Sequence, residues 1–85
     1  MEHKIGHVIH YFNNIGVAVL YLTEELKVGD SVHFLGHTTD FVQKVASMEV
    51  THKKIQVAKP QEEVAMKVGE PVRGNDGVYI LEEEA

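Results

Sequence analysis

The sequence predicts a small all-β protein, folded as a closed antiparallel β-barrel of six or seven strands. Apolar residues alternate over short segments, turn residues separate these segments, and no long stretch shows helical periodicity. An open sheet of this size would expose unpaired edges, which favours closure into a barrel. The 85 residues suffice for one domain. We assign residues 1–81 to a single barrel domain and residues 82–85 to an acidic, disordered tail.

The first two predicted strands flank a turn. Ile5–Phe12 alternates in hydrophobicity, and Gly16–Leu22 is apolar on both faces, as in a strand covered on two sides. Asn13–Gly16 is predicted as the turn between them because Asn and Gly tolerate positive φ. Thr23–Leu26 is a polar connection that could form a single helical turn.

A Gly–Asp turn at Val28–Asp30 opens the next strand, Ser31–Leu35, which ends in the polar loop Gly36–Asp40. Phe41–Thr51 is predicted as one long strand. The β-branched content and the neighbouring strands favour this assignment over a helix across residues 41–48, which the apolar spacing also fits. One face of this strand would carry Val42, Ala46, Met48 and Val50.

The remainder alternates short strands with turns that contain Gly, Pro, Asn and charged residues. The predicted strands are Ile55–Ala58, Val64–Val68 and Val78–Leu81. The predicted turns are His52–Lys54, Gln61–Glu63, Gly69–Pro71 and Gly74–Gly77.

The charge balance argues against a generic nucleic-acid binder, because the formal net charge is −5. Residues 41–60 are locally basic, with four lysines against Glu49. Cysteine is absent, which excludes disulfides and cysteine-based zinc sites. We find no apolar run near 18 residues and no signal-peptide pattern, and expect a cytoplasmic protein without membrane association.

No catalytic constellation stands out. His3, His7 and His10 have helical spacing for a metal face, but on a strand His10 opposes the other two, so no metal site is predicted. The sequence has no nucleophile–base pattern and no phosphate-binding glycine loop. We therefore predict that the chain is not an enzyme, binds no cofactor, and is not a small hydrolase.

The order of several short motifs resembles the second, β-barrel domain of the elongation factor Tu superfamily, the translation-protein type of barrel. These motifs are Ile5–Val8, Gly16–Val19, Leu26–Val32, Gly36 and the closing segment Pro71–Val78. The closing segment departs from the family pattern through residues inserted between Gly74 and Val78. The resemblance implies a barrel fold and proximity to translation.

Two central segments, Asp40–Met48 and Ile55–Gln61, are similar to the C-terminal barrel of the collagenase-like peptidase family. Some members of that family act in tRNA or rRNA hydroxylation. The resemblance implies an accessory barrel, separate from the catalytic portion of such proteins.

Two functions remain open. The first is a binding module associated with translation or RNA modification, which contacts RNA (tRNA or rRNA) or a translation-related protein. The second is a protein-interaction or oligomerisation module that uses an apolar face through Ile9, Tyr11, Leu20 and Leu22. The predicted contact residues for the first are His37, Thr38, Thr39, Lys44, Lys53, Lys54 and Arg73.

Overall fold

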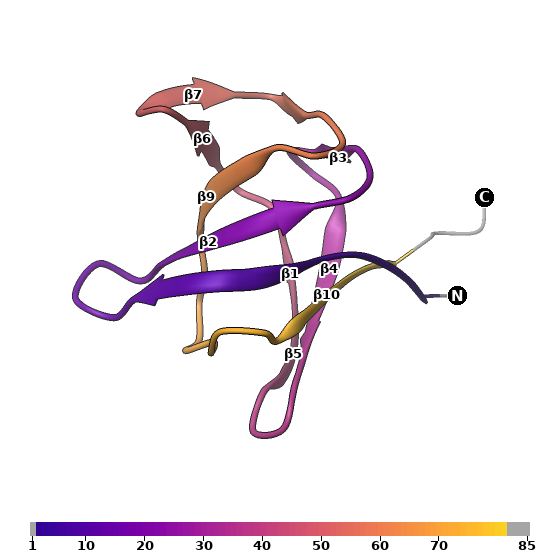
Figure 1. Ribbon diagram of the computed structural model, residues 1–85, viewed down its shortest axis with the longest axis vertical. Helices are drawn as coiled ribbons and strands as arrows, with labels where there is room; N and C mark the ends of the chain where they lie inside the picture. Colours follow the sequence, from indigo (N-terminus) through magenta and orange to yellow (C-terminus); the bar gives the residue numbers. More distant parts are fainter. Residues whose placement is uncertain (1, 82–85) are drawn as a thin grey trace.

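The computed structural model describes residues 2–81, which form ten strands and no helix (Figure 1). The predicted all-β class is confirmed, and the described residues therefore include no helix that could cross a membrane. The predicted tail, 82–85, lies outside the described residues. The strands are β1 (Glu2–Phe12), β2 (Val17–Leu22), β3 (Leu26–Lys27), β4 (Ser31–Leu35), β5 (Asp40–Lys44), β6 (Met48–Val50), β7 (Lys53–Ile55), β8 (Val57–Ala58), β9 (Glu63–Lys67) and β10 (Gly77–Leu81).

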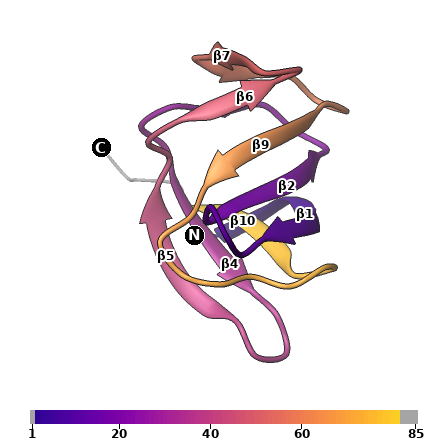
Figure 2. The same cartoon turned by 90° about the vertical axis from the view of Figure 1, so that its left-hand side faces the viewer.

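Eight of the strands form one curled sheet in the order β5-β4-β10-β1-β2-β9-β6-β7, and β3 pairs separately with β8 (Figures 1 and 2). The prediction of a closed barrel is not confirmed, because the sheet ends in two edges, β5 and β7. Between residues 2 and 81, no strand ladder joins β5 to the chain that follows β9. We call the line along which β5 faces residues 67–73 the seam.

A single side chain bridges the seam at the end of β5. The side-chain Oε1 of Gln43 accepts a hydrogen bond from the Gly69 amide at 2.8 Å, and its Nε2 donates to the Lys67 carbonyl at 3.0 Å. A side-chain amide thus stands where a closed barrel would have main-chain pairing.

The concave side of the sheet holds one apolar core. Leu20, Phe34, Val64 and Val78 are fully buried, each from a different strand. Each such side chain stabilises the fold by about 1.5–3 kcal/mol through the apolar surface that it buries.

Two irregularities in β1 change which residues enter this core. The register against β10 shifts between Lys4 and Gly6, and the register against β2 shifts between Val8 and His10. Ile5 and Val8, which would lie on opposite faces of a regular strand, are consequently both buried. Gly6 is required beside the first shift, because a Cβ there would lie 2.1 Å from the Tyr21 carbonyl oxygen.

The single long strand predicted for residues 41–51 is wrong. The chain leaves the strand after Lys44 and resumes as β6 at Met48. Val45 lies in the break, where its N–H donates to the Asp30 carbonyl and its own carbonyl accepts from Gly29 N–H. The break turns Val45 into the core and leaves Val42 54% exposed, the reverse of the predicted facing.

Most of the predicted turns are confirmed, and a residue with positive φ marks several of them. Gly16 has φ of 65° and Gly29 has φ of 100°, each in a predicted turn. The turn predicted at His52–Lys54 is displaced, since Thr51 and His52 have positive φ and Lys53 begins β7. The helical turn considered for 23–26 does not form, and Leu26 starts β3.

Candidate functional site

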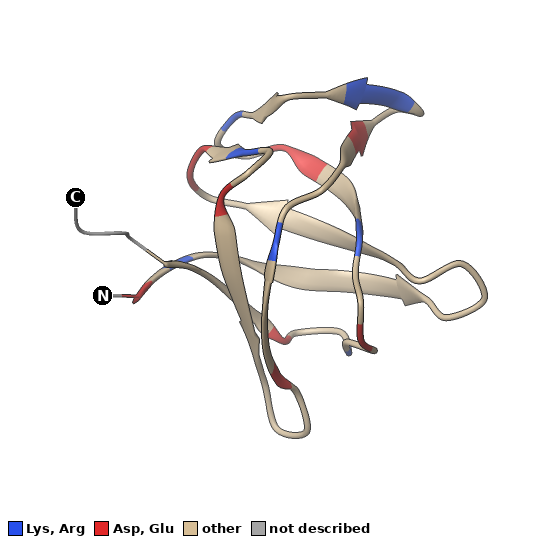
Figure 3. Ribbon diagram, turned by 180° about the vertical axis from the view of Figure 1, so that it is seen from behind, with Lys and Arg blue, Asp and Glu red and all other residues tan. Residues whose placement is uncertain are grey.

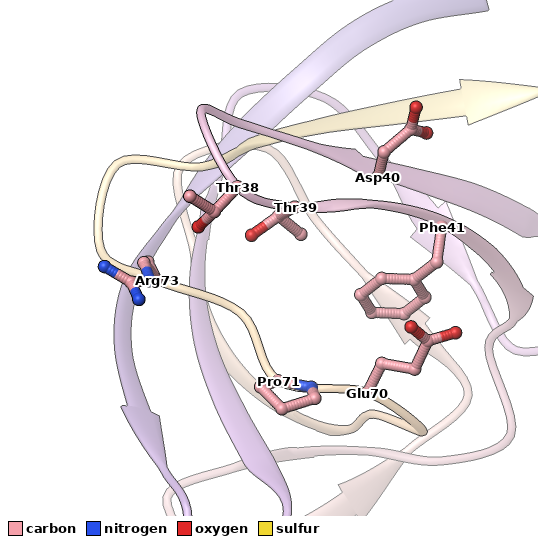
Figure 4. Close-up of a pocket in the computed structure, with 7 residues that line it drawn as sticks. All are labelled: Thr38, Thr39, Asp40, Phe41, Glu70, Pro71 and Arg73. Carbon is pink, nitrogen blue, oxygen red and sulfur yellow. The ribbon is translucent and has the colours of Figure 1, made fainter.

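A pocket of 420 Å³ lies on the seam, between the β4–β5 hairpin and the chain that precedes β10 (Figure 4). Its lining contains an aromatic ring, two hydroxyl groups, two carboxylates and a guanidinium group. The residues are Thr38, Thr39, Asp40, Phe41, Glu70, Pro71 and Arg73.

The buried Asp76 closes a turn on Arg73 in one wall of the pocket, and the other wall packs against it. It accepts a hydrogen bond from the Arg73 amide at 2.8 Å, and the Asp76 amide donates to the Arg73 carbonyl at 3.1 Å. The hairpin approaches this carboxylate so closely that a Cβ on Gly36 would lie 1.9 Å from Asp76 Oδ1. A glycine at the hairpin and an aspartate in the opposite loop therefore set the spacing of the walls.

The floor of the pocket is fixed by aromatic packing and by the hairpin turn. The ring of Phe41 stacks on Phe34, with centroids 5.1 Å apart. Thr39 is buried, and its carbonyl accepts from the Gly36 amide at 2.8 Å. The apolar part of the lining is thus packed against the core and the hairpin turn.

Asp40 is held by a histidine on β4. His33 Nε2 lies 2.5 Å from Asp40 Oδ1, and its Nδ1 lies 2.6 Å from Glu2 Oε1. The hydrogen bond to Asp40, followed by that to Glu2, raises the pKa of His33, because the protonated ring donates from both nitrogens. His33 thereby links β1, β4 and β5.

Charged groups of opposite sign stand at the two ends of the pocket. Arg73 lies beside Thr38 and Glu70 lies beside Phe41 (Figure 4). Between residues 2 and 81, no salt bridge engages either charged group. With Asp40 included, the lining carries one positive and two negative groups.

The structure brings some of the predicted contact residues together and separates others. Thr38, Thr39 and Arg73 line the pocket, and His37 is exposed in the same hairpin turn. The three lysines lie elsewhere, because Lys44 ends β5, while Lys53 and Lys54 lie in β7, the opposite edge of the sheet. β7 and the hairpin tip are at opposite ends of the molecule, and the basic residues are scattered over it (Figures 1 and 3).

A second hollow, of 500 Å³, lies beside the β1–β2 turn. Its lining includes the exposed side chains of Phe12 and Ile15.

The apolar face predicted from the sequence does not form. Leu20 and Leu22 are fully buried, whereas Ile9 is 42% exposed and Tyr11 is partly buried. Of the predicted face, Ile9 alone is an exposed large hydrophobic residue, and among the described residues the exposed apolar surface otherwise consists of Phe12, Ile15, Leu35, Val42 and Val57.

The three histidines considered as a metal face have separate neighbours. His3 contacts Glu24, His7 lies 5.8 Å from the Tyr21 ring, and His10 lies 4.4 Å from Phe12. In the part of the chain that the structure describes, no three His, Cys, Asp or Glu side chains gather in a way that could hold a metal ion.

The predicted contact residues omit four pocket residues, Asp40, Phe41, Glu70 and Pro71, although Asp40 belongs to the predicted polar loop Gly36–Asp40. Phe41 was expected to be part of a continuous strand, and residues 69–71 were expected to be a simple turn. The available signal was the Gly–Asn–Asp–Gly run at 74–77, whose aspartate can close a turn on the preceding Arg73.

Comparison with known proteins identifies one curated relative and two solved structures that are similar to this chain. The chain is 38% identical over 81 residues to an uncharacterised protease of Methanocaldococcus jannaschii, a match that covers 94% of the chain and 20% of that protein. The chain thus spans about a fifth of the length of this curated relative. No family model matches the chain.

Two crystal structures share the fold. The C-terminal domain of a Geobacillus thermoleovorans protein assigned to the U32 peptidases superposes with a TM-score of 0.86 at 22% identity, covering 92% of this chain and 91% of that chain. The selenomethionine variant of the same domain gives a TM-score of 0.85 at 23% identity, covering 89% of this chain and 96% of that chain.

These comparisons correct one prediction and refine another. The prediction that the chain is not an enzyme is contradicted, since the similar proteins are named a protease and a U32 peptidase. The chain is similar to the C-terminal domain of such a peptidase, which fits the predicted collagenase-like peptidase barrel. The resemblance to the second domain of elongation factor Tu stays a prediction.

Proposed function

We propose that this domain binds polypeptide for a U32-type peptidase, in the pocket between the β4–β5 hairpin and residues 70–73. The names of the similar proteins support polypeptide as the ligand class. The fold match to a C-terminal domain supports a role beside the remainder of such a protein.

The chemistry of the pocket carries this proposal. An aromatic floor, two hydroxyl groups and charged groups of both signs suit a polypeptide, which offers apolar side chains, amide groups and charges of either sign. The arrangement suits nucleic acid poorly, because Glu70 would repel a phosphate backbone.

RNA contact, the first hypothesis from the sequence, uses the hairpin loop and Arg73 together with Lys44, Lys53 and Lys54, and these three lysines lie outside the pocket. Oligomerisation, the second hypothesis, would use exposed apolar residues such as Phe12 and Ile15. Both are outcomes that an experiment must separate from polypeptide binding.

The test is an amide NMR titration of the labelled full chain with an unfolded polypeptide, reduced and carboxymethylated α-lactalbumin, and separately with tRNA. We expect the polypeptide to shift the resonances of residues 38–41 and 70–73. Replacing Arg73 by Ala should weaken this binding, while Lys59→Ala, an exposed lysine outside the pocket, serves as the matched control.

Two results would overturn the proposal. One is a set of shifts at Lys53 and Lys54 with tRNA and none with the polypeptide. The other is a set of concentration-dependent shifts at Phe12 and Ile15 in the absence of any ligand, together with an unresponsive pocket.

A further inference from the structure

The hydrogen bonds at the two ends of the β4–β5 hairpin determine which of its opposed residue pairs are hydrogen-bonded. At the turn, Gly36 and Thr39 exchange main-chain hydrogen bonds of 2.8 and 3.4 Å. At the other end, the Val45 amide donates to the Asp30 carbonyl at 2.8 Å. Bonded pairs alternate with open pairs along an antiparallel ladder. In this register the intervening bonded pairs are Phe34↔Phe41 and Val32↔Gln43.

The remaining residues of β5 direct their main-chain groups away from β4. These residues are Asp40, Val42 and Lys44, and β5 is paired with β4 alone. Their N–H and C=O groups therefore face the seam, at the edge where the pocket opens.

The two edges of the sheet differ in how they are protected. The edge strand β7 has three residues, of which Lys53 and Lys54 are two, and short lysine-bearing edges resist strand addition. The edge strand β5 has five residues, with exposed charged residues Asp40 and Lys44 at its ends and the exposed Val42 at its centre. Of the two edges, β5 is the better template for a further strand.

The contacts of Gln43 show that main-chain groups along the seam can hydrogen-bond an amide group. Its primary amide donates to the Lys67 carbonyl and accepts from the Gly69 amide, the pairing that a peptide group would make. Towards the hairpin this bridging stops and the pocket begins, with a volume suited to a few residues of extended chain.

The charges define a direction for such a chain. β5 runs from the Arg73 end of the pocket towards the Glu70 end (Figure 4). A strand antiparallel to β5 would begin near Glu70 and finish near Arg73. A basic residue near its start and an acidic residue near its end would complement both groups.

We propose that an extended polypeptide segment adds to the open edge of β5 as an antiparallel strand. The segment exchanges main-chain hydrogen bonds with Val42 and Asp40, and it places one side chain over Phe41. Its basic residue lies beside Glu70, and its acidic residue lies beside Arg73. This inference rests on the proposed polypeptide binding and specifies its mode.

The test uses a five-residue peptide, acetyl-Lys-Val-Thr-Val-Glu-amide, and the labelled full chain, with amide NMR as the readout. We expect shifts at residues 39–44 and 70–73. A peptide with Lys and Glu exchanged should bind several-fold more weakly. N-methylation of the three central residues should abolish binding, because it removes the donors that strand addition needs.

Val42→Pro is the matched protein variant. It deletes an N–H that faces the seam and leaves the bonds between β5 and β4 in place, so we expect binding about tenfold weaker. Val42→Ala keeps the N–H and should bind within about twofold of the parent chain. The N-methylated peptide gives the same information if the proline variant does not fold.

Failure of this inference differs from failure of polypeptide binding itself. If unfolded α-lactalbumin shifts the pocket resonances but the N-methylated peptide binds as well as its parent, polypeptide binding stands and strand addition is wrong. If neither the polypeptide nor the peptide shifts residues 38–41 and 70–73, both proposals are wrong.

Discussion

The protonation state of His33 affects its contact with Asp40, a residue that lines the pocket. It is mostly buried between β1 and β5, and its two nitrogens contact Glu2 and Asp40. A neutral imidazole carries one N–H, so it can donate to only one of these carboxylates, while the protonated ring donates to both. The charge on His33 therefore determines whether the ring can donate to Asp40, the first residue of β5, and to Glu2 at the same time.

We expect the stability of the chain to fall as pH rises through neutrality. The folded-state pKa of His33 is raised by hydrogen bonds to Asp40 and Glu2, so its stabilising contribution is complete below the unfolded pKa of about 6.5. That contribution is lost as pH rises through the raised value. Because Asp40 is 73% exposed, we expect an effect below about 1 kcal/mol.

Urea unfolding between about pH 5.5 and 8.5 measures this effect. The decline should be smaller in His33→Gln than in the parent chain. His37→Gln, in the exposed hairpin turn, should keep the parent slope. Equal slopes in all three proteins would contradict the assignment to His33.

At the scale of elements, the seam separates this fold from a closed barrel. Gln43 ties β5 to the end of β9 through two hydrogen bonds to main-chain groups. Each such bond contributes about 0.5–1.5 kcal/mol to stability. The sheet thus remains curled without a strand ladder along the seam.

Replacing Gln43 by Ala should lower the free energy of unfolding by about 1–2 kcal/mol, because it removes both hydrogen bonds. It should also speed hydrogen exchange at the Gly69 amide, which loses its acceptor. Gln56→Ala is the control, since Gln56 is an exposed glutamine between β7 and β8. A loss of equal size in the control would show that the bridge carries no stability.

The sequence predicted correctly those turns whose conformation depends on the residues of the turn itself. The turns at Gly16 and Gly29 follow from residues that accept positive φ. The break at Val45 could not be predicted in this way, because its hydrogen bonds go to residues 29 and 30, far back in the chain. The shifts in β1 depend likewise on two neighbouring strands at once.

The same distinction applies to the pocket. Thr38 and Thr39 were predicted as part of the polar loop Gly36–Asp40, and Arg73 was predicted as a cation that could contact phosphate. Glu70 and Pro71 were missed because they come near Phe41 only when the hairpin meets the chain before β10. No periodicity within either segment carries that information.

At the scale of the whole molecule, the two ends of the described chain are neighbours. β1 pairs with β10, and Glu2 lies opposite Leu81 (Figure 1). Chain connectivity between the ends can therefore be changed without stretching the sheet.

A circular permutant that joins the ends through a short glycine–serine linker, with new termini between Asn13 and Asn14, should keep the fold. The new break lies in an exposed turn between β1 and β2, so we expect to lose less than about 2 kcal/mol of stability. Matching amide chemical shifts in β4, β9 and β10 would confirm this. A new break between Leu20 and Tyr21, inside β2, is the control and should prevent folding.

The pairing of β1 with β10 also determines how the domain responds to mechanical force. Because the strands are antiparallel and Glu2 faces Leu81, tension applied at these two residues pulls on the same end of the ladder. The hydrogen bonds then bear the load one after another, as in a zipper, and not all together as in shear. A pull through these ends would therefore peel β1 from β10 at low force and open the core beneath them, starting near Ile5.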